Sequence, residues 1–338
     1  MSNIEALVYE LFEPRKLYLK KELIDPGSLL PNELIAKTCY TALSPGTELG
    51  AYCGMEPLRT DIPAYPRVVG YCNIAQVIYK GGDVTKLDIG DYFLNFQSHR
   101  SHFKYSENDF FIKLSGATIK NQCAAYLFHL GYHSLLTGRM QQGHNVGIIG
   151  LGTLGYATSV MSKIAGAATF VLSNQPSHKA LLESKQIILL PKDISSVDTI
   201  YKRTHQIGID VVINTSNTWD DWALALHCVN KGGTIVNLGF PGRDQPLPKF
   251  NPLDPRFLYM KNVTIKYLTA LNRSGFTPHE QRFNMERNLL YILDLMENNV
   301  IDAGEVISVE IPYIDLEKQY LLYELKKENL FSTLLNWQ

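Results

Sequence analysis

The sequence has no long apolar run and no excess of charge of either sign. No segment reaches the ~18 uncharged apolar residues that a membrane-spanning helix needs, and the first residues, MSNIEALVYELFEPRKLYLKKEL, carry charges throughout with no apolar signal core. There are 32 Lys and Arg against 33 Asp and Glu, for a formal net charge of -1. We therefore expect neither nucleic-acid nor membrane-surface binding driven by charge.

Cysteine is also scarce. The five cysteines are an odd number, they are widely spaced, and they include no C-x-x-C pair. This argues against a disulfide framework and favours a reducing compartment. We expect a cytoplasmic protein.

Length and composition indicate a packed protein of two domains. The chain has 338 residues, of which 45% are hydrophobic and 19% charged. That composition is unlike a disordered chain, and the length exceeds what one core usually organises.

The pattern of elements changes near residue 122. Before about residue 115, short strand-like segments such as IEALVYE, CNIAQVIY and DYFLNF are separated by turns, including Pro45-Gly46. After it, strands and helices alternate, which predicts a parallel sheet with crossover helices. The tail reads as helix, strand and helix and ends in the strand-like STLLNW. The five prolines of residues 240–255 predict an irregular stretch.

A glycine-rich turn carries the clearest chemical signal. NVGIIGLGTLG reads as a strand, a G-x-G-x-x-G turn and the start of a helix. Gly150 permits the turn, Gly152 lets the amides of the next residues, Thr153 and Leu154, approach a pyrophosphate, and Gly155 lets the helix lie close to the strand. The anion would lie at the helix N-terminus. The sequence therefore predicts a dinucleotide site, and a site for S-adenosylmethionine is the weaker alternative.

The end of the next strand indicates the type of dinucleotide. TFVLSNQPSHKALLESK has no Asp or Glu where a carboxylate would bind the adenosine ribose hydroxyls. It offers Ser173, Asn174, Ser177, His178 and Lys179, which are neutral or basic and can accept a 2′-phosphate. We expect NADP(H) rather than NAD(H).

Six segments in order resemble one family. They are SPGTELG (44–50), YPRVVGYCNIAQVI (65–78), VTKLDIGDYF (84–93), GIIGLGTLG (147–155), GIDVVINTS (208–216) and GGTIVNLGFPG (232–242). Together they are similar to the medium-chain dehydrogenase/reductase superfamily of alcohol dehydrogenases and quinone reductases. The resemblance implies an α/β protein, with a GroES-like β-barrel catalytic domain from residues 1–122 and 272–338 and a Rossmann doubly wound parallel sheet from residues 123–271.

The same resemblance shows where this chain departs from zinc-dependent members. The positions of their zinc ligands fall on Pro45, on Tyr71 and Cys72 of GYC, and near Tyr126. Proline cannot bind zinc and tyrosine is an uncommon ligand. The cysteines of a structural zinc lobe are also missing between Cys72 and Cys123. A site rebuilt from Cys72, His99, His102 and His129 would need an unusual geometry, so we expect no metal and a zinc-independent branch.

Without zinc, hydroxyl groups are the candidates for holding and protonating a developing oxyanion. By resemblance, Thr47 faces the reacting oxygen, and Tyr71 and Tyr126 lie near the active site. Thr47 could instead support the Pro45-Gly46 turn, and the tyrosines could only fill space. His102, His129 and His133 are weaker candidates.

The ends of two later strands should face the coenzyme, because ligands bind outside the carboxyl ends of parallel strands. These ends offer Asn214, Thr215, Leu238, Gly239 and Phe240. A basic residue that many family members place near the coenzyme phosphates corresponds to about Ser332 here. The resemblance also implies a homodimer paired through VTIKYLTA (263–270).

The leading hypothesis is a zinc-independent, NADPH-dependent oxidoreductase that transfers hydride to a carbonyl or an activated C=C bond of a small organic substrate. The sequence does not separate ketone reduction from enone or quinone reduction. The alternative is a nucleotide-binding protein without turnover on the same scaffold.

Overall fold

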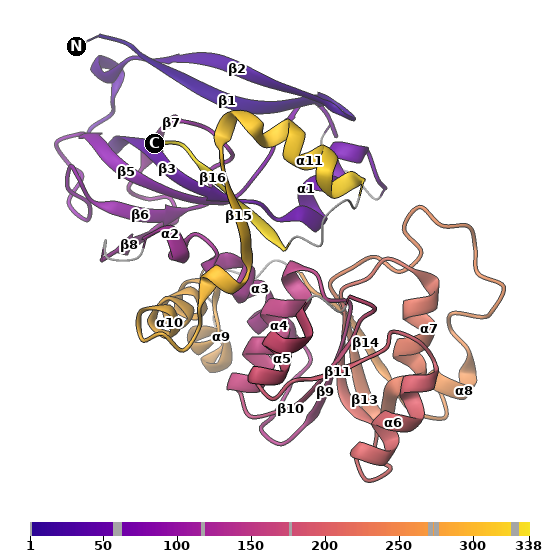
Figure 1. The fold of residues 1–338 in the computed structure, drawn as a ribbon. Helices are drawn as coiled ribbons and strands as arrows, with labels where there is room; N and C mark the ends of the chain where they lie inside the picture. Colours follow the sequence, from indigo (N-terminus) through magenta and orange to yellow (C-terminus); the bar gives the residue numbers. More distant parts are fainter. Residues whose placement is uncertain are drawn as a thin grey trace. The chain divides into compact units, whose positions relative to one another are not determined.

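The computed structural model describes residues 2–56, 63–115, 119–175, 178–269, 273, 277–325 and 331–338 (Figure 1). The chain divides into two compact units. Unit 1 comprises Met1–Tyr126 and Arg273–Gln338, and unit 2 comprises Leu127–Asn272. The sequence predicted breaks after residues 122 and 271. Of the residues named above, Ser177 and the last residue of VTIKYLTA lie outside the described ranges.

Unit 1 is built mainly from antiparallel strands. Its larger described sheet has the order β15 (Ile307–Pro312), β16 (Ser332–Asn336), β3 (Glu33–Ala42), β5 (Cys72–Lys80), β6 (Tyr92–Asn95) and β8 (Ile112–Leu114), with β7 (His102–Ser106) also paired to β3. A smaller sheet has the order β2 (Lys16–Ile24), β1 (Ile4–Glu13) and β4 (Arg67–Val68). The described α-helices that complete it are α1 (Pro45–Cys53), α2 (Ile119–Gln122), α9 (Pro278–Arg282), α10 (Met285–Glu297) and α11 (Leu316–Glu324).

The two ends of the chain meet in this unit. β16 pairs with β3 in the register Leu334 to Ala42, so the last strand joins a sheet formed by the first hundred residues. Buried aromatic side chains of both segments, including Tyr52, Tyr320 and Trp337, share one core. Burial of this apolar surface explains why the tail belongs to unit 1.

One predicted turn is wrong. Pro45-Gly46 does not separate two strands; Pro45 instead begins helix α1 (Pro45–Cys53), which ends at Gly54 with a φ of 75°. Proline is well suited to the first helical position because its fixed φ matches the helix and its missing N–H is not needed there. The consequence is that Thr47 and Glu48 lie in the first turn of a helix.

Unit 2 contains one parallel sheet. Its strand order is β11 (Ile188–Leu190), β10 (Ala168–Leu172), β9 (Asn145–Ile149), β12 (Ile209–Asn214), β13 (Val229–Asn237) and β14 (Thr264–Tyr267). All five pairings are parallel. In chain order this is the 3-2-1-4-5-6 arrangement of a Rossmann sheet. The predicted fold class is confirmed.

Helices precede and connect these strands, in agreement with the predicted alternation of strands and helices. They are α3 (Ala125–Thr137, which begins in unit 1), α4 (Thr153–Ile164), α5 (Lys179–Ser184), α6 (Ser195–Arg203), α7 (Trp219–Cys228) and the short α8 (Pro255–Leu258). The Thr218 side chain caps α7 by accepting from the Asp221 N–H, 3.2 Å away. The proline-rich residues before α8 form no helix or strand.

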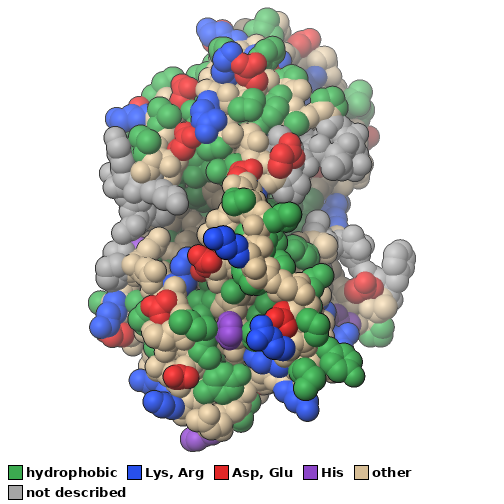
Figure 2. Space-filling model, turned by 90° about the vertical axis from the view of Figure 1, so that its right-hand side faces the viewer, with side chains coloured by type: hydrophobic (Ala, Val, Ile, Leu, Met, Phe, Trp, Pro, Cys, Tyr) green, Lys and Arg blue, Asp and Glu red, His purple; other side chains and the backbone are tan. Residues whose placement is uncertain are grey.

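The surface carries charges of both signs. On the face shown in Figure 2, acidic and basic side chains are interspersed and neither forms a continuous area. No helix in the described ranges combines the length and the apolar character needed to cross a bilayer.

Two histidines of α3 are buried in unit 2. The rings of His129 and His133 stack with centroids 5.8 Å apart. Burial lowers the pKa of His129 to about 3, with His133 adding to the effect, and burial lowers the pKa of His133 to about 4. Both imidazoles are therefore neutral in the folded protein near pH 7.

We predict that these histidines make unit 2 sensitive to acid. In the unfolded chain a histidine takes up a proton below a pKa of about 6.5, whereas the folded unit binds it only near pH 3 to 4. Stability should therefore be lost as pH falls from about 6.5 toward 4, by up to about 1.4 kcal/mol per pH unit for each histidine. Urea unfolding of a His129→Gln/His133→Gln double variant should show a shallower loss over this range. The exposed His205→Asn variant should keep the wild-type slope, and equal slopes for all three proteins would contradict the prediction.

Candidate functional site

The glycine turn of unit 2 requires glycine at two positions. Gly150 follows β9 with a φ of 96°, and a Cβ there would lie 2.5 Å from Thr215 Oγ1. A Cβ on Gly155 would lie only 2.1 Å from the carbonyl oxygen of Gly150. The first position needs the left-handed region that glycine adopts without strain, and the second needs a helix that lies against the turn itself. Both predicted roles agree with this geometry.

Gly152 differs from Gly150 and Gly155 because a side chain at this position would project into open space. It is the N-cap of α4, with φ -90° and ψ -169°, and no heavy atom lies within 4 Å of an added Cβ. The N–H groups of the first helical turn, here Thr153, Leu154 and Gly155, have no acceptor inside the helix. They and the helix dipole favour an anion at this end. The residues present therefore fit the phosphates of a dinucleotide.

The next strand end in the sheet lies against the same turn. The Thr215 hydroxyl donates to the Ile149 carbonyl oxygen at 2.9 Å. Asn214 Nδ2 donates to Asn237 Oδ1 at 3.0 Å, and the Asn214 carbonyl accepts from Leu238 N at 2.9 Å and Gly239 N at 3.2 Å. The structure thus brings four predicted residues together at the ends of β12 and β13, beside the point where the strand order reverses.

Gly239 is a further glycine with no room for a side chain, and Phe240 lies outside this cluster. A Cβ on Gly239 would lie 2.3 Å from the Ser216 carbonyl oxygen. The Phe240 side chain is exposed, and its backbone N–H donates to Asn217 Oδ1 at 2.8 Å. Its ring has the Arg243 guanidinium over it, 5.2 Å from the centroid.

The predicted 2′-phosphate residues divide into two groups. Ser173 and Asn174 follow β10, where Ser173 Oγ accepts from Gln175 N at 3.1 Å and Asn174 Oδ1 accepts from the backbone N–H of Lys192 at 2.9 Å. Lys179 lies on α5, where its exposed ammonium is 3.8 Å from Glu183. Lys179 is therefore a solvated surface charge.

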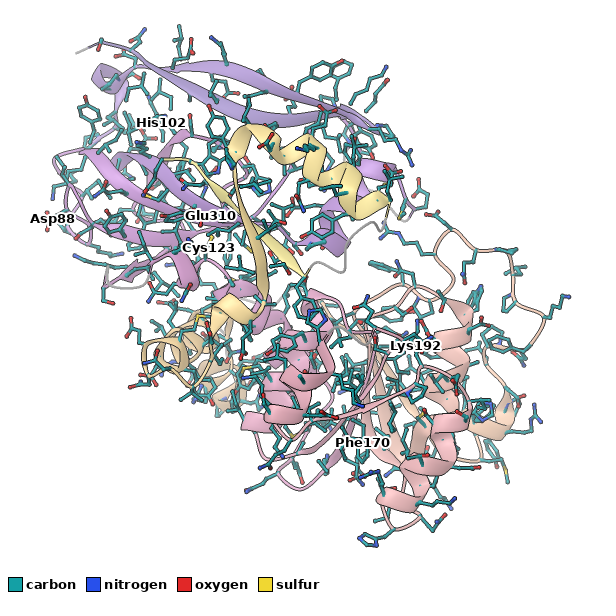
Figure 3. All side chains as sticks on the ribbon, viewed as in Figure 1. Asp88, His102, Cys123, Phe170, Lys192 and Glu310 are labelled. Carbon is teal, nitrogen blue, oxygen red and sulfur yellow. The ribbon has the colours of Figure 1, made fainter. Side chains whose placement is uncertain are left out.

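Lys192 is a cation that the sequence reading missed. It follows β11 (Figure 3), and its Nζ donates to Asp221 Oδ2 at 2.7 Å, to which Ser216 Oγ also donates. Its sequence signal is that it lies just after β11, which ends at Leu190 and whose carboxyl end is at the same sheet edge as that of β10. Its contact with Asn174 is what places it near the predicted ribose end.

The three predicted catalytic residues come together in unit 1. The Tyr71 hydroxyl donates to Ser44 Oγ and is also hydrogen-bonded to the Thr47 side chain. The Tyr126 ring meets the Tyr71 ring edge to face, with centroids 5.5 Å apart. The Phe96 ring also meets Tyr126 edge to face, with centroids 4.8 Å apart. The result is a cluster of hydroxyl groups next to aromatic surface.

Burial controls the protonation of these phenols. It raises the pKa of Tyr71 far above its ordinary value, with smaller contributions from Cys72 and Glu48, while the hydrogen bonds that Tyr71 forms with Ser44 and Thr47 act in the opposite direction. Burial also raises the pKa of Tyr126 to about 12, with Cys72 adding to the effect. Both side chains are therefore neutral at pH 7 and can only act as proton donors there.

The side chains near the family's metal positions do not fit a zinc ion. Cys72 and Cys123 are buried thiols whose pKa values burial raises, and Cys123 Sγ lies 3.4 Å from the Cys72 carbonyl oxygen. His99 is bound to Thr41 and Glu48, and His102 Nδ1 lies 3.0 Å from Ser101 Oγ. Within the described residues, no three His, Cys, Asp or Glu side chains are grouped so as to hold a metal.

The chain is similar in sequence to known dehydrogenases and reductases. A family model described as zinc-binding dehydrogenase matches residues 153–283. The NADP-dependent isopropanol dehydrogenase of Thermoanaerobacter brockii is 25% identical over 209 residues, which cover 60% of this chain and 54% of that protein. The mitochondrial enoyl-[acyl-carrier-protein] reductase 1 of Candida tropicalis is 24% identical over 265 residues, 68% of this chain and 66% of that protein. The chain thus matches about half the length of the first of these relatives and two thirds of the second.

A solved structure with the same fold extends the similarity over nearly the whole chain. The 2R,3R-butanediol dehydrogenase of Bacillus subtilis aligns with a TM-score of 0.78 and 16% identity, covering 98% of this chain and 99% of that one. At this identity the likeness concerns the fold, and the sequence matches carry the kinship. The matches in sequence and in fold make this chain similar to dehydrogenases and reductases of the medium-chain dehydrogenase/reductase superfamily.

Proposed function

We propose that this protein is a zinc-independent, NADPH-dependent oxidoreductase that transfers hydride to a carbonyl or an activated C=C bond of a small organic substrate. The observation that carries the proposal is the open helix N-terminus at Gly152, between two glycines that admit no side chain. It lies where the strand order of the parallel sheet reverses, which is where such sheets bind dinucleotides.

The preference for NADP(H) is supported by charge. Ser173 and Asn174 end β10 without a carboxylate, and Lys192 is held next to Asn174. Lys179 lies on the helix that follows and is free to move in solvent with Glu183. The ammonium of Lys192 is paired with Asp221, so the groups that a 2′-phosphate would meet at this strand end are the Ser173 hydroxyl, the Asn174 amide and the exposed Lys179 ammonium. A carboxylate in place of these groups would repel the phosphate.

A bound reduced nicotinamide coenzyme supplies the hydride. The side chains of unit 1 would supply the proton. For a carbonyl it must reach the substrate oxygen as the carbonyl carbon accepts the hydride, and for an activated C=C bond it must reach one carbon of that bond as the other carbon accepts the hydride. Tyr71 is placed to donate it, because its phenol is neutral and is oriented by Ser44 and Thr47. The exposed Thr47 hydroxyl can then hydrogen-bond the product oxygen, and Tyr126 contributes a second donor beside an apolar ring.

Zinc independence is supported by the side chains that this chain has at the family's metal positions. The resemblance to the family does not by itself imply it. Pro45 starts a helix and Tyr71 is engaged with Ser44, so neither supplies a metal ligand. The relatives named above include both an alcohol dehydrogenase type and an enoyl reductase type. The hydroxyl cluster would serve reduction of either a carbonyl or an enone.

We further propose a cytoplasmic homodimer. All five cysteines lie in the described part of the chain as thiols rather than disulfides, which suits a reducing compartment. The sheet of unit 2 ends at β14, an edge strand with half of the Tyr267 side chain exposed and with the exposed Tyr259 and Met260 just before it. An apolar edge of this kind needs a cover.

The glycine turn generates a first prediction. Gly152→Ala should leave the melting temperature unchanged, because the added Cβ meets open space, but should weaken NADPH binding about tenfold, or about 1.4 kcal/mol, by obstructing the phosphates. Gly155→Ala should instead lower stability by about 1–3 kcal/mol, since its Cβ would overlap a backbone carbonyl. Fluorescence titration and thermal unfolding measure both. Wild-type protein that binds neither NADPH nor NADH would disprove the proposal, and tighter binding of NADH would disprove its coenzyme preference.

The hydroxyl cluster generates a second prediction. With NADPH and a panel of a short ketone, an aromatic aldehyde, an enone and a quinone, the wild type should oxidise the coenzyme in the presence of at least one class. Tyr71→Phe should lower kcat for that substrate by about 10²–10⁴, with NADPH affinity kept. Tyr105→Phe, which removes a phenol bound to the Phe110 carbonyl elsewhere in unit 1, serves as the matched control. If the protein binds NADPH but oxidises it with none of these four kinds of substrate, the result would instead indicate a non-catalytic nucleotide-binding protein.

The exposed edge strand generates a third prediction. Sedimentation should show a dimer, and Tyr267→Lys should shift it toward monomer, because like charges would face each other across a symmetric strand pair. A monomeric wild type at micromolar concentration would refute the dimer.

A further inference from the structure

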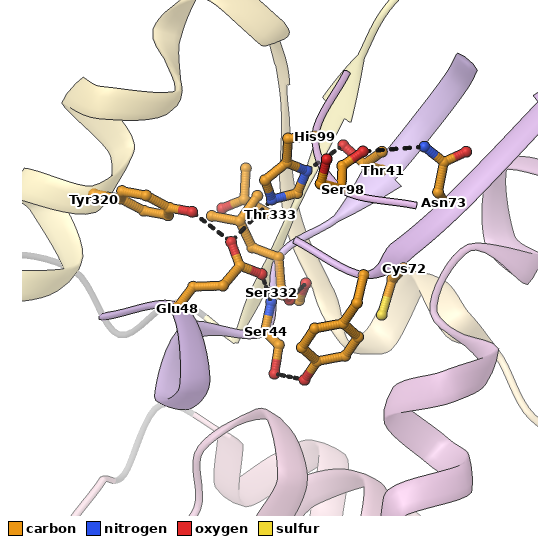
Figure 4. Close-up of polar contacts among 12 residues, drawn as sticks. Thr41, Ser44, Glu48, Cys72, Asn73, Ser98, His99, Tyr320, Ser332 and Thr333 are labelled. Carbon is orange, nitrogen blue, oxygen red and sulfur yellow. Dashed lines mark hydrogen bonds and ion pairs between the residues drawn. The ribbon is translucent and has the colours of Figure 1, made fainter. Parts of the chain in front are cut away.

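A buried carboxylate lies behind the hydroxyl cluster in unit 1. Glu48, in the first turn of α1, is only 2% exposed. Its Oε1 accepts from the Ser44 N–H at 2.7 Å, and its Oε2 accepts from the Tyr320 hydroxyl at 2.5 Å and lies 2.9 Å from His99 Nε2 (Figure 4). Three donors thus converge on one side chain, which is the arrangement that a buried carboxylate requires.

The imidazole of His99 is one of the hydrogen-bond partners of the Glu48 carboxylate, and it is fully buried. Because a carboxylate only accepts, the proton of the shared hydrogen bond lies on His99 Nε2. The other ring nitrogen, Nδ1, is 2.8 Å from Thr41 Oγ1, which also accepts from Trp337 Nε1 at 3.0 Å. Both nitrogens are occupied, so the orientation of the imidazole is determined by contacts on either side.

The pair is connected to Tyr71 by two separate contacts. At the backbone, Gly70 lies against the imidazole: it has a φ of 86°, and an added Cβ would lie 2.6 Å from His99 Nε2. At the hydroxyl, Tyr71 donates to Ser44 Oγ, and the backbone of Ser44 is held by Glu48. Ser44 is the N-cap of α1, yet its side chain makes no capping bond. Its hydroxyl is used for Tyr71, and Glu48 binds its N–H.

We propose that Glu48, together with His99, is a positioning residue that fixes both the backbone and the hydroxyl of Tyr71 in the orientation needed for proton donation. This inference rests on the proposed function, since it concerns the proton donor of that reaction. A buried carboxylate and imidazole are costly to desolvate, and apolar side chains of similar volume would support the fold equally well. Their retention next to Tyr71 is explained by the orientation that they impose.

The test uses the full-length protein and the substrate class that the wild type reduces. Glu48→Gln keeps the shape but replaces one acceptor oxygen by an NH₂ group that faces donors. It should lower kcat about tenfold and leave the KM and the affinity for NADPH within about twofold. In a Tyr71→Phe background the same substitution should lower kcat by less than twofold, because no hydroxyl remains to be oriented.

Two further variants separate positioning from stability. Glu107→Gln is the matched control, because Glu107 is a largely buried carboxylate of unit 1 that accepts from the backbone N–H groups of Thr85 and Lys86. It should lower the melting temperature without a change in kcat. If Glu48→Gln does not fold, Tyr320→Phe, which removes one donor to Glu48, should give a smaller loss of kcat that is likewise absent in the Tyr71→Phe background.

A spectroscopic measurement distinguishes failure of this inference from failure of the proposed function. With ¹³Cζ-labelled tyrosine, the Tyr71 signal, assigned from the Tyr71→Phe variant, should shift in Glu48→Gln and stay in place in Glu107→Gln, whether or not any substrate is turned over. An unchanged Tyr71 signal, or equal losses of kcat in the presence and absence of the Tyr71 hydroxyl, would overturn the positioning role.

Discussion

Helix α4 can lie against the first strand of the parallel sheet only because residue 155 has no side chain. A Cβ at Gly155 would overlap the carbonyl oxygen of Gly150, and a Cβ at Gly150 would overlap the hydroxyl of Thr215. These two close approaches bring the start of α4 and the end of β12 to one place. The helix N-terminus then faces open space at Gly152, with amides that have no partner inside the helix. The coenzyme site proposed for unit 2 depends on this packing.

The two units offer different kinds of polar group. Unit 2 presents backbone amides and a helix dipole, which bind phosphate without ionising. Unit 1 presents phenol and alcohol hydroxyls, and burial keeps the phenols of Tyr71 and Tyr126 neutral. The first set suits holding a charged coenzyme, and the second suits giving a proton to a reduced substrate. Neither requires a metal ion for the reaction proposed.

The polar interior of unit 1 also explains how a protein can place a tyrosine with precision. Glu48, His99 and Thr41 form a chain of hydrogen bonds that ends at Trp337 on one side and at Ser44 on the other. Each of these buried polar atoms has a partner, which favours one arrangement of the hydrogen bonds. Gly70 packs against the His99 imidazole, and this contact also holds the backbone of the next residue, Tyr71.

Local patterns in the sequence determined the class of fold, the glycine turn and the strand ends with Asn214 and Leu238. Each of these features depends on residues that are neighbours in the chain and on a periodicity that only one type of element satisfies. The helix at Pro45 was missed because proline and glycine are equally common in turns and at helix starts. The Glu48–His99–Tyr320 group was decided by tertiary structure alone. Its members are far apart in the sequence, and no spacing encodes which buried donor will meet which acceptor when distant strands and helices pack together.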